Sequence, residues 1–249
     1  MVAINTNPQN ARVARALESD DTSVRLRAAM AVGSNPDPVF LEVLVERCAV
    51  EPDFYVRDML CWALTRLSPE ATLPRIRQEL VSERPQARSQ ALHLLSKIGD
   101  RNAWPWVTRA VLRDTDDGVA RTAWRVAVVL VPEEEGTKER LADELALQFG
   151  RGDRSVRLSL SRALVDLGDV IGPVLERAAL NPDPGVVAHA RATELLLQDP
   201  EAGFDAAVEE AERMVTLGPE RAAAAAAAEA ASAGTGTTEP ARPPKAADC

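Results

Sequence analysis

One spacing recurs along most of the chain and limits what it can fold into. Six short segments carry Val or Ala three residues after an Asp or an equivalent residue. These anchor residues are Val24, Val56, Ala87, Val119, Val156 and Val186. Successive anchors are 32, 31, 32, 37 and 30 residues apart, and the long step contains an insertion at 132–136. A period in this range is typical of arrays that stack one supersecondary unit many times.

Each anchor is expected to open a helix. A carboxylate just before the anchor can accept the free backbone N–H groups of a first helical turn and oppose the positive helix end. Apolar residues follow the anchor at offsets 4, 7 and 8, which places them on one helix face. In the first repeat they are Ala28, Ala31 and Val32. Because many residues of this stripe are small, neighbouring helices can approach closely.

A second amphipathic helix follows in each repeat, after a break in Gly, Ser, Asp or Pro. These helices are expected near residues 38–49, 69–81, 103–113, 137–149, 170–180 and 201–215. No segment of useful length alternates with a period of two, so we predict no sheet. A single helical hairpin cannot bury its apolar faces alone, and stacking supplies the core. The sequence therefore predicts an all-α protein.

The repeats resemble a known family. The pattern Asp-x-x-Val-Arg-x-x-Ala-x-x-Ala-Leu is best matched by residues 21–33 and next by residues 153–168. It looks like the short HEAT-like repeats first associated with phycobilin lyases, and the resemblance covers residues 19–215. It implies a right-handed α-solenoid (an α-α superhelix) of about six HEAT-like helical hairpins. It says little about function, because such arrays serve many unrelated partners.

The resemblance also implies a structural ladder between adjacent repeats, formed by the Arg after the anchor and the preceding Asp. The ladder arginines would be Arg25, Arg57, Arg88 and Arg157. Ala120 and Val187 replace Arg in the fourth and sixth repeats, and Arg84 replaces Asp in the third. We therefore expect an incomplete ladder and slightly irregular stacking near repeats three and four.

The two ends of the chain differ from the repeats. We expect residues 1–18 to form an N-terminal capping helix and residues 19–217 to form the repeat array. Residues 218–249 are expected to be an Ala-rich helix and a flexible, disordered tail. The run of alanines at 222–228 favours helix but offers little to bury, and residues 234–249 contain Thr, Pro and Gly.

The net charge and the hydropathy of the chain limit which binding partners and which cellular compartment are expected. The 29 basic and 38 acidic residues give a net charge of −9, which opposes general binding to nucleic acid or to an anionic membrane. No run approaches about 18 apolar residues, and the first ten residues show no basic segment followed by an apolar one. We expect a cytoplasmic protein that has no membrane-spanning helix.

Residues that could hold a metal or activate a nucleophile are scarce. The three cysteines lack any C-x-x-C spacing, so neither a disulfide framework nor a zinc site is expected. One HEAT-like hydroxylase group binds iron through His-Glu pairs, whereas this chain has only His93 and His189 and no His-Glu dipeptide. No nucleophile motif or phosphate-binding loop occurs. We expect no metal, no cofactor and no catalytic residue, and we interpret both histidines as ordinary outer-helix residues.

The tryptophans are the candidate partner-binding residues. Trp62 lies at offset six in its helix, in line with Met30 and His93, and could contribute to an apolar ridge. Trp104 and Trp106 flank a proline and cannot readily share one helical face, so one could pack into the core while the other stays partly exposed. The alternative is that all three rings only pack within the array. Exposed tryptophans are enriched where interfaces concentrate their energy.

The sequence thus favours a non-enzymatic scaffold or adaptor that binds a protein or peptide. One alternative is a bilin-lyase-like chromophore attachment subunit, because the repeat type is similar. Another is a HEAT-like DNA glycosylase, which uses a concave basic cleft with aromatics and an Asp. The tryptophans of this chain would suit a glycosylase. However, the predicted second helices carry mixed charge and show no continuous basic stripe. Enzymatic activity therefore stays an open alternative.

Overall fold

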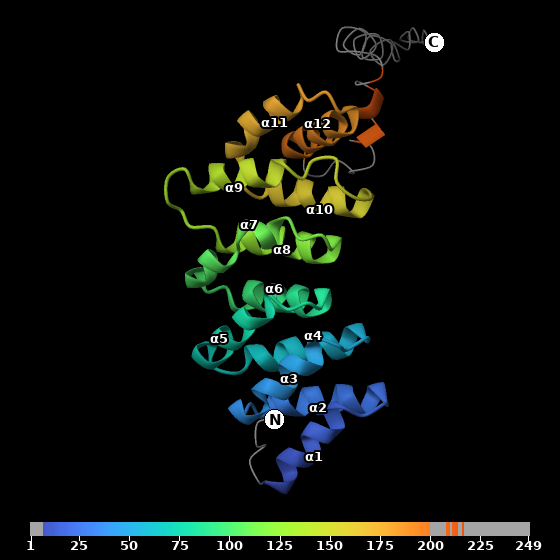
Figure 1. Ribbon diagram of the computed structural model, residues 1–249, viewed down its shortest axis with the longest axis vertical. Helices are drawn as coiled ribbons and strands as arrows, with labels where there is room; N and C mark the ends of the chain where they lie inside the picture. The colour runs from blue at the N-terminus through green and yellow to red at the C-terminus, as the bar shows by residue number, and fades with distance from the viewer. Residues whose placement is uncertain (1–6, 200–207, 210, 214–215, 217–249) are drawn as a thin grey trace, which may run out of the picture.

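The computed structural model describes residues 7–199, 208–209, 211–213 and 216. Over these residues the regular structure is helical, with no strand. Helical hairpins follow one another along a single long axis, with the first helices towards one side of the stack and most second helices towards the other (Figure 1). This arrangement is an α-solenoid, so the predicted fold class is confirmed.

The first helices of the six repeats form a continuous layer in which each helix contacts the next. They are α2 (Thr22–Ser34), α4 (Phe54–Thr65), α6 (Pro85–Ile98), α8 (Asp117–Leu130), α10 (Arg154–Val165) and α12 (Pro184–Gln198). Five of them begin at an Asp whose carboxylate accepts backbone N–H groups of the first turn, as the sequence predicts. Arg84 precedes α6 without such a bond. Each cap stabilises its helix by about 1 kcal/mol.

The second helices form the other layer. They are η1 with α3 (Pro38–Phe40 and Leu41–Cys48), α5 (Pro69–Glu79), η2 with α7 (Arg101–Trp106 and Arg109–Leu112), α9 (Thr137–Ala146), and η3 with α11 (Asp169–Ile171 and Gly172–Ala178). Helix α1 (Pro8–Leu17) packs on α2 and α3. The sixth second helix, predicted at 201–215, lies mostly outside the described residues, and so does the tail predicted at 218–249.

The second helix of the third repeat is broken, although the sequence predicted one helix over 103–113. The backbone of Val107 leaves the helical region after η2, and Thr108 then caps α7 by accepting the Val111 N–H at 3.4 Å. Pro105 lies inside η2, where it has no N–H to donate to a longer helix. The irregularity therefore lies within one repeat, in the connection that carries Trp104 and Trp106.

Most of the core is one contiguous apolar cluster that runs along the stack from Leu17 to Ala190, and a second, smaller cluster includes Ala188, Ala192 and Leu196 of α12. Large side chains such as Leu60 and Trp124 fill its centre, and buried alanines on the first helices let neighbouring helices lie close together. Cys48 and Cys61 are buried thiols in this cluster, so they pack as small apolar residues. Because each hairpin buries its faces against the next, the array as a whole supplies the stability.

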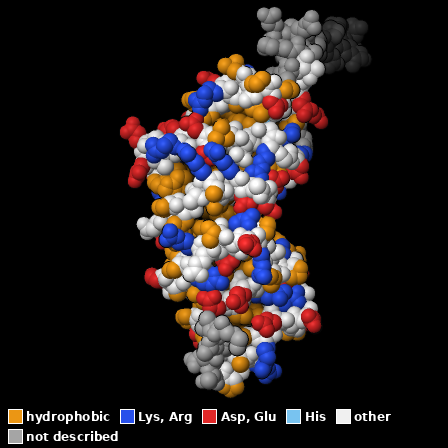
Figure 2. Space-filling view, in the orientation of Figure 1, with side chains coloured by type: hydrophobic (Ala, Val, Ile, Leu, Met, Phe, Trp, Pro, Cys, Tyr) orange, Lys and Arg blue, Asp and Glu red, His pale blue; other side chains and the backbone are white. Residues whose placement is uncertain are grey.

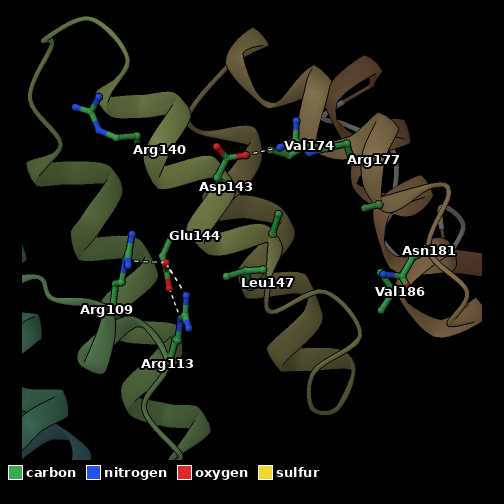
Figure 3. A pocket seen from close by; sticks show the side chains of 12 residues that line it. Arg109, Arg113, Arg140, Asp143, Glu144, Leu147, Val174, Arg177, Asn181 and Val186 are labelled. Carbon is green, nitrogen blue, oxygen red and sulfur yellow. Dashed lines mark hydrogen bonds and ion pairs between the residues drawn. The ribbon is translucent and has the colours of Figure 1, made fainter.

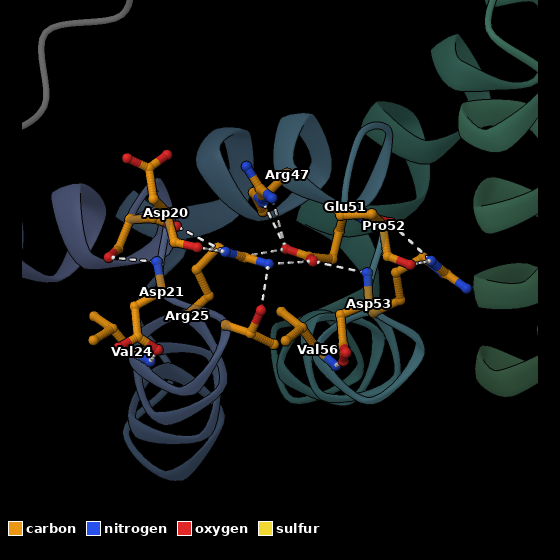
Figure 4. Close-up of polar contacts among 12 residues, drawn as sticks. Asp20, Asp21, Val24, Arg25, Arg47, Glu51, Pro52, Asp53 and Val56 are labelled. Carbon is orange, nitrogen blue, oxygen red and sulfur yellow. Dashed lines mark hydrogen bonds and ion pairs between the residues drawn. The ribbon is translucent and has the colours of Figure 1, made fainter.

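The arginine ladder is present, but its acidic partners differ from those predicted. The Asp residues before the anchors cap their own helices instead of meeting the arginines. Arg25 pairs with Glu51 through two contacts of 2.8 and 2.9 Å, and both side chains are buried (Figure 4). Arg88 pairs with Asp114 at 2.7 and 2.9 Å. Each acid lies two residues before the capping Asp of the next repeat, and this loop position decides where a ladder pair forms.

Uncharged residues occupy the same loop position opposite two of the ladder arginines, Arg57 and Arg157. Ser82 stands there in the third repeat, and Arg57 keeps its bonds to the carbonyl oxygens of residues 51 and 52 at 2.8 and 2.7 Å, which Arg25 and Arg88 also make to their own preceding loops. Asn181 stands there in the sixth repeat, and the Nε of Arg157 is buried without a hydrogen-bond partner among the described residues. The ladder is therefore incomplete, as predicted: Ala120 leaves the fourth repeat without a ladder arginine, and the missing loop acids are a second cause.

Candidate partner-binding surfaces

Helix α4 carries the most exposed aromatic side chains of the described residues. Phe54 and Tyr55 are 66% and 71% exposed, and their rings meet edge to face with centroids 5.6 Å apart. They occupy the first turn of α4, directly after its capping Asp53. The corresponding positions of the other five repeats hold no aromatic residue. The two rings therefore have no role in the repeat pattern itself.

Trp62 extends this exposed region to the neighbouring repeat. Its indole lies against Gly33 of α2, where a Cβ atom would come within 2.1 Å of the ring atom Cζ3. Gly33 thus provides the space that the ring fills, and 38% of Trp62 remains exposed. Met30 precedes Gly33 by one helical turn and is 48% exposed. We call Phe54, Tyr55, Trp62 and Met30 the aromatic surface.

A hollow of about 330 Å³ lies beside Phe54, between α4, α6 and α8. Arg57 and Arg125 line it together with the partly buried His93. Burial, with Lys97 and Arg125 nearby, lowers the pKa of His93. An imidazole, two guanidinium groups and the Asp58 carboxylate therefore border the exposed ring of Phe54.

Trp104 and Trp106 lie elsewhere, in η2, and both are partly buried against the core. The Arg77 guanidinium of α5 sits over the Trp106 ring, 5.3 Å from its centroid. Trp62 packs on α2, whereas Trp106 meets α5, so the three predicted partner-binding tryptophans do not form one site. Trp124 is fully buried, and its Nε1–H donates to the Leu112 carbonyl at 2.9 Å.

A groove of about 530 Å³ crosses the second helices α7, α9 and α11 (Figure 3). Its charged lining residues are Arg109, Arg113, Arg140, Asp143, Glu144 and Arg177. Space-filling representation shows Lys and Arg side chains gathered at the level of α9, with acidic side chains beside them (Figure 2). The sequence did indicate mixed charge on the second helices, but it did not locate a groove there.

Ion pairs join the helices that form this groove. Glu144 of α9 accepts from Arg113 at 2.8 Å and lies 3.3 Å from Arg109, both in the α7 region. Asp143 pairs with Arg177 of α11. Exposed pairs of this kind contribute little to stability. They do fix the guanidinium groups relative to one another, which matters for recognition.

Both histidines were interpreted as ordinary residues of the outer helices, and His189 lies in α12 with its side chain buried. Its Nδ1 accepts the Gly150 N–H at 3.1 Å, so the proton resides on Nε2, which faces the Arg157 carbonyl at 3.0 Å and the Ser161 hydroxyl at 3.1 Å. Burial lowers the pKa of His189 to about 4. Ser161 and Thr193 are fully buried beside it, so this polar cluster is structural and closed to a substrate.

Other site types find no support in the part of the chain that the structure describes. No three His, Cys, Asp or Glu side chains come together there as a metal site requires. None of the described helices combines the length and the apolar character needed to cross a bilayer.

Comparison with known proteins agrees with the architecture. Residues 41–127, from the start of α3 into α8, match the family model of HEAT repeats. The predicted HEAT repeats are thus confirmed over this segment. A crystal structure described as an engineered protein is 17% identical, with 79% of this chain and 96% of that chain covered and a TM-score of 0.42. No curated protein matches the sequence.

Proposed function

We propose that the chain is a non-enzymatic scaffold or adaptor and that a partner protein docks on the aromatic surface. The observation that carries this proposal is the exposure of Phe54, Tyr55 and Trp62 in a chain with only 4% aromatic residues. Tyr and Trp dominate the energetics of protein interfaces, and clustered exposed apolar side chains mark interaction sites. HEAT repeats commonly serve protein recognition, which agrees with this role.

The surroundings of the aromatic surface suit a protein interface. Charged side chains such as Arg57, Asp58 and Arg66 lie on the same helix, and exposed Asp58 is one turn after Phe54 and one turn before Trp62. Interfaces combine apolar rings with polar and charged side chains in this way. The hollow beside Phe54 gives room for one side chain of the partner.

The prediction that Trp104 and Trp106 also contact a partner stays a prediction. Their rings are partly buried, and a partner approaching Trp106 would meet the Arg77 guanidinium as well. The alternatives of a bilin-lyase-like subunit and a DNA glycosylase likewise stay predictions. Trp124 is buried and the groove has mixed charge, so neither the aromatic nor the electrostatic features favour a glycosylase cleft.

Site-specific photo-crosslinking tests the proposed surface. A photoreactive phenylalanine analogue replaces Tyr55 in the full chain, and the same analogue replaces Val81 as a control, because Val81 is 84% exposed and lies outside the aromatic surface. We expect a discrete protein adduct from Tyr55 in native extract and none of that mass from Val81. Excess unlabelled chain should abolish the adduct, whereas a folded Phe54→Ser/Trp62→Ser chain should not. Equal adducts at both positions, or equal competition by both chains, would overturn the proposal.

A further inference from the structure

We propose that the groove across α7, α9 and α11 is a second docking site and that its occupant is an acidic peptide segment with an apolar side chain. The site lies on the second-helix layer and shares no residue with the aromatic surface. Its test is therefore independent of the function proposed above.

The charge of the groove is the first argument. Four arginines face two carboxylates there, although the whole chain has a net charge of −9. Arg109 and Arg177 keep 83% and 63% of their side chains exposed. A local positive excess on a negative molecule attracts anionic groups. The complementary partner is therefore a segment rich in Asp or Glu.

The hydrogen-bonding capacity of the groove is the second argument. Glu144 is only 10% exposed and already lies between two arginines, so its charge is shared. Arg140 donates through Nη2 to the Thr137 hydroxyl at 2.7 Å, which is a neutral partner. A guanidinium group has five N–H donors and can hold a carboxylate with two parallel bonds. Arg109 and Arg140 therefore retain donors for carboxylates of a ligand.

An apolar wall is the third argument, and it distinguishes a peptide from a simple anion. Leu147 at the end of α9 is 64% exposed and points into the groove region with Val174 and Val186 of the neighbouring elements (Figure 3). Packed helices lie about 8–10 Å apart, and an extended peptide advances about 3.3 Å per residue. Acidic residues about three positions apart, with Leu or Val between them, would match this arrangement.

The two carboxylates of the groove argue against a nucleic acid. Asp143 is 58% exposed and would face a continuous phosphate backbone at close range. Affinity for nucleic acid depends on neutralising successive phosphates with clustered cations, and an intervening carboxylate repels them. A peptide can place a neutral residue there, which a nucleic acid backbone cannot.

Fluorescence anisotropy of the full chain tests the proposal with defined probes. The probe is a labelled eight-residue peptide in which two Glu residues flank a Leu, and the comparison peptides replace both Glu by Gln or the Leu by Ser. We expect the acidic Leu peptide to bind at least about tenfold more tightly than either comparison peptide. The Arg109→Ser/Arg140→Ser chain should lose about tenfold in affinity for it. The matched control, Arg84→Ser/Arg162→Ser, removes the same charge from exposed positions outside the groove and should bind normally.

A second variant separates the apolar part of the site from its charge. Leu147→Ser should weaken binding of the Leu peptide but leave the weaker binding of the Ser peptide unchanged. Circular dichroism and thermal melting should show that all variants remain folded, because the substituted side chains are exposed. The proposal is overturned if no peptide binds, or if both arginine pairs have equal effects. Tighter binding of a 20-nucleotide single-stranded DNA through Arg109 and Arg140 would also overturn it.

Discussion

Individual buried charges connect neighbouring repeats in this array. Glu51, in the loop that leads to the second repeat, binds Arg25 of α2 and Arg47 of α3 in the first repeat, and it also accepts the backbone N–H of Asp53 at 2.9 Å. Burial alone would raise the pKa of Glu51, but hydrogen bonds from Arg25, Asp53 and Arg47 lower it below its usual value. Removing one partner of such a pair leaves a buried charge uncompensated.

Substitution of Glu51 should therefore be costly. We expect Glu51→Ala to lower the free energy of unfolding by about 3 kcal/mol. Glu42→Ala is the matched control, because Glu42 pairs with Arg75 with 42% of its side chain exposed, and its loss should cost less than about 1 kcal/mol. Urea unfolding followed by circular dichroism measures both. Equal losses of unfolding free energy would show that the buried Arg25–Glu51 pair contributes no more to stability than the exposed Glu42–Arg75 pair.

The buried His189 should make stability depend on pH. Its pKa is 6.5 in an unfolded chain and about 4 in the folded one, so the unfolded state binds more protons between these values. Stability should be fully present above pH 6.5 and decrease as the pH falls towards 4, by up to about 3 kcal/mol. Thermal melting at pH 7, 5.5 and 4.5 measures this change. His189→Gln should flatten the slope in that window, and an unchanged slope would contradict the assignment.

At the scale of helices, the sequence patterns predicted where a helix begins better than whether it continues without a break. The capping Asp residues fixed where five first helices begin, because a carboxylate before a first turn has one favourable use. The break before α7 was missed, because the apolar periodicity of 103–113 continues across it while Thr108 starts a new helix. Ladder partners were also missed, since they depend on how a loop of the next repeat folds.

Close contact between α2 and α4 depends on Gly33. In Gly33→Ala, the new Cβ would overlap the Trp62 ring, so the ring must move and unfolding free energy should fall by about 1–3 kcal/mol. Gly172→Ala in α11 is the control, because no atom lies within 4 Å of its new Cβ and the change should be neutral. Chemical unfolding gives both values, and tryptophan emission reports the ring. A neutral Gly33→Ala would mean that α2 and α4 are less closely packed.

At the scale of the whole molecule, the repeat spacing predicted the architecture but only part of the candidate surfaces. Trp62 was identified, because its offset placed it outside the core stripe. Phe54 and Tyr55 were missed, although the sequence held a usable signal: the corresponding first-turn positions of the other five repeats hold no aromatic residue. The groove was missed because it joins three helices from different repeats, and sequence order does not show their side-by-side placement.

The central claim is that a partner protein covers the aromatic surface. The most direct test is hydrogen–deuterium exchange of the chain alone and in the presence of its partner. The partner is the protein that crosslinking at position 55 identifies, and it is supplied in purified form. We predict slower exchange in peptides from α4 and from the end of α2 around Met30, with α10 unchanged. Protection confined to other helices, or no protection at saturating partner, would contradict the claim.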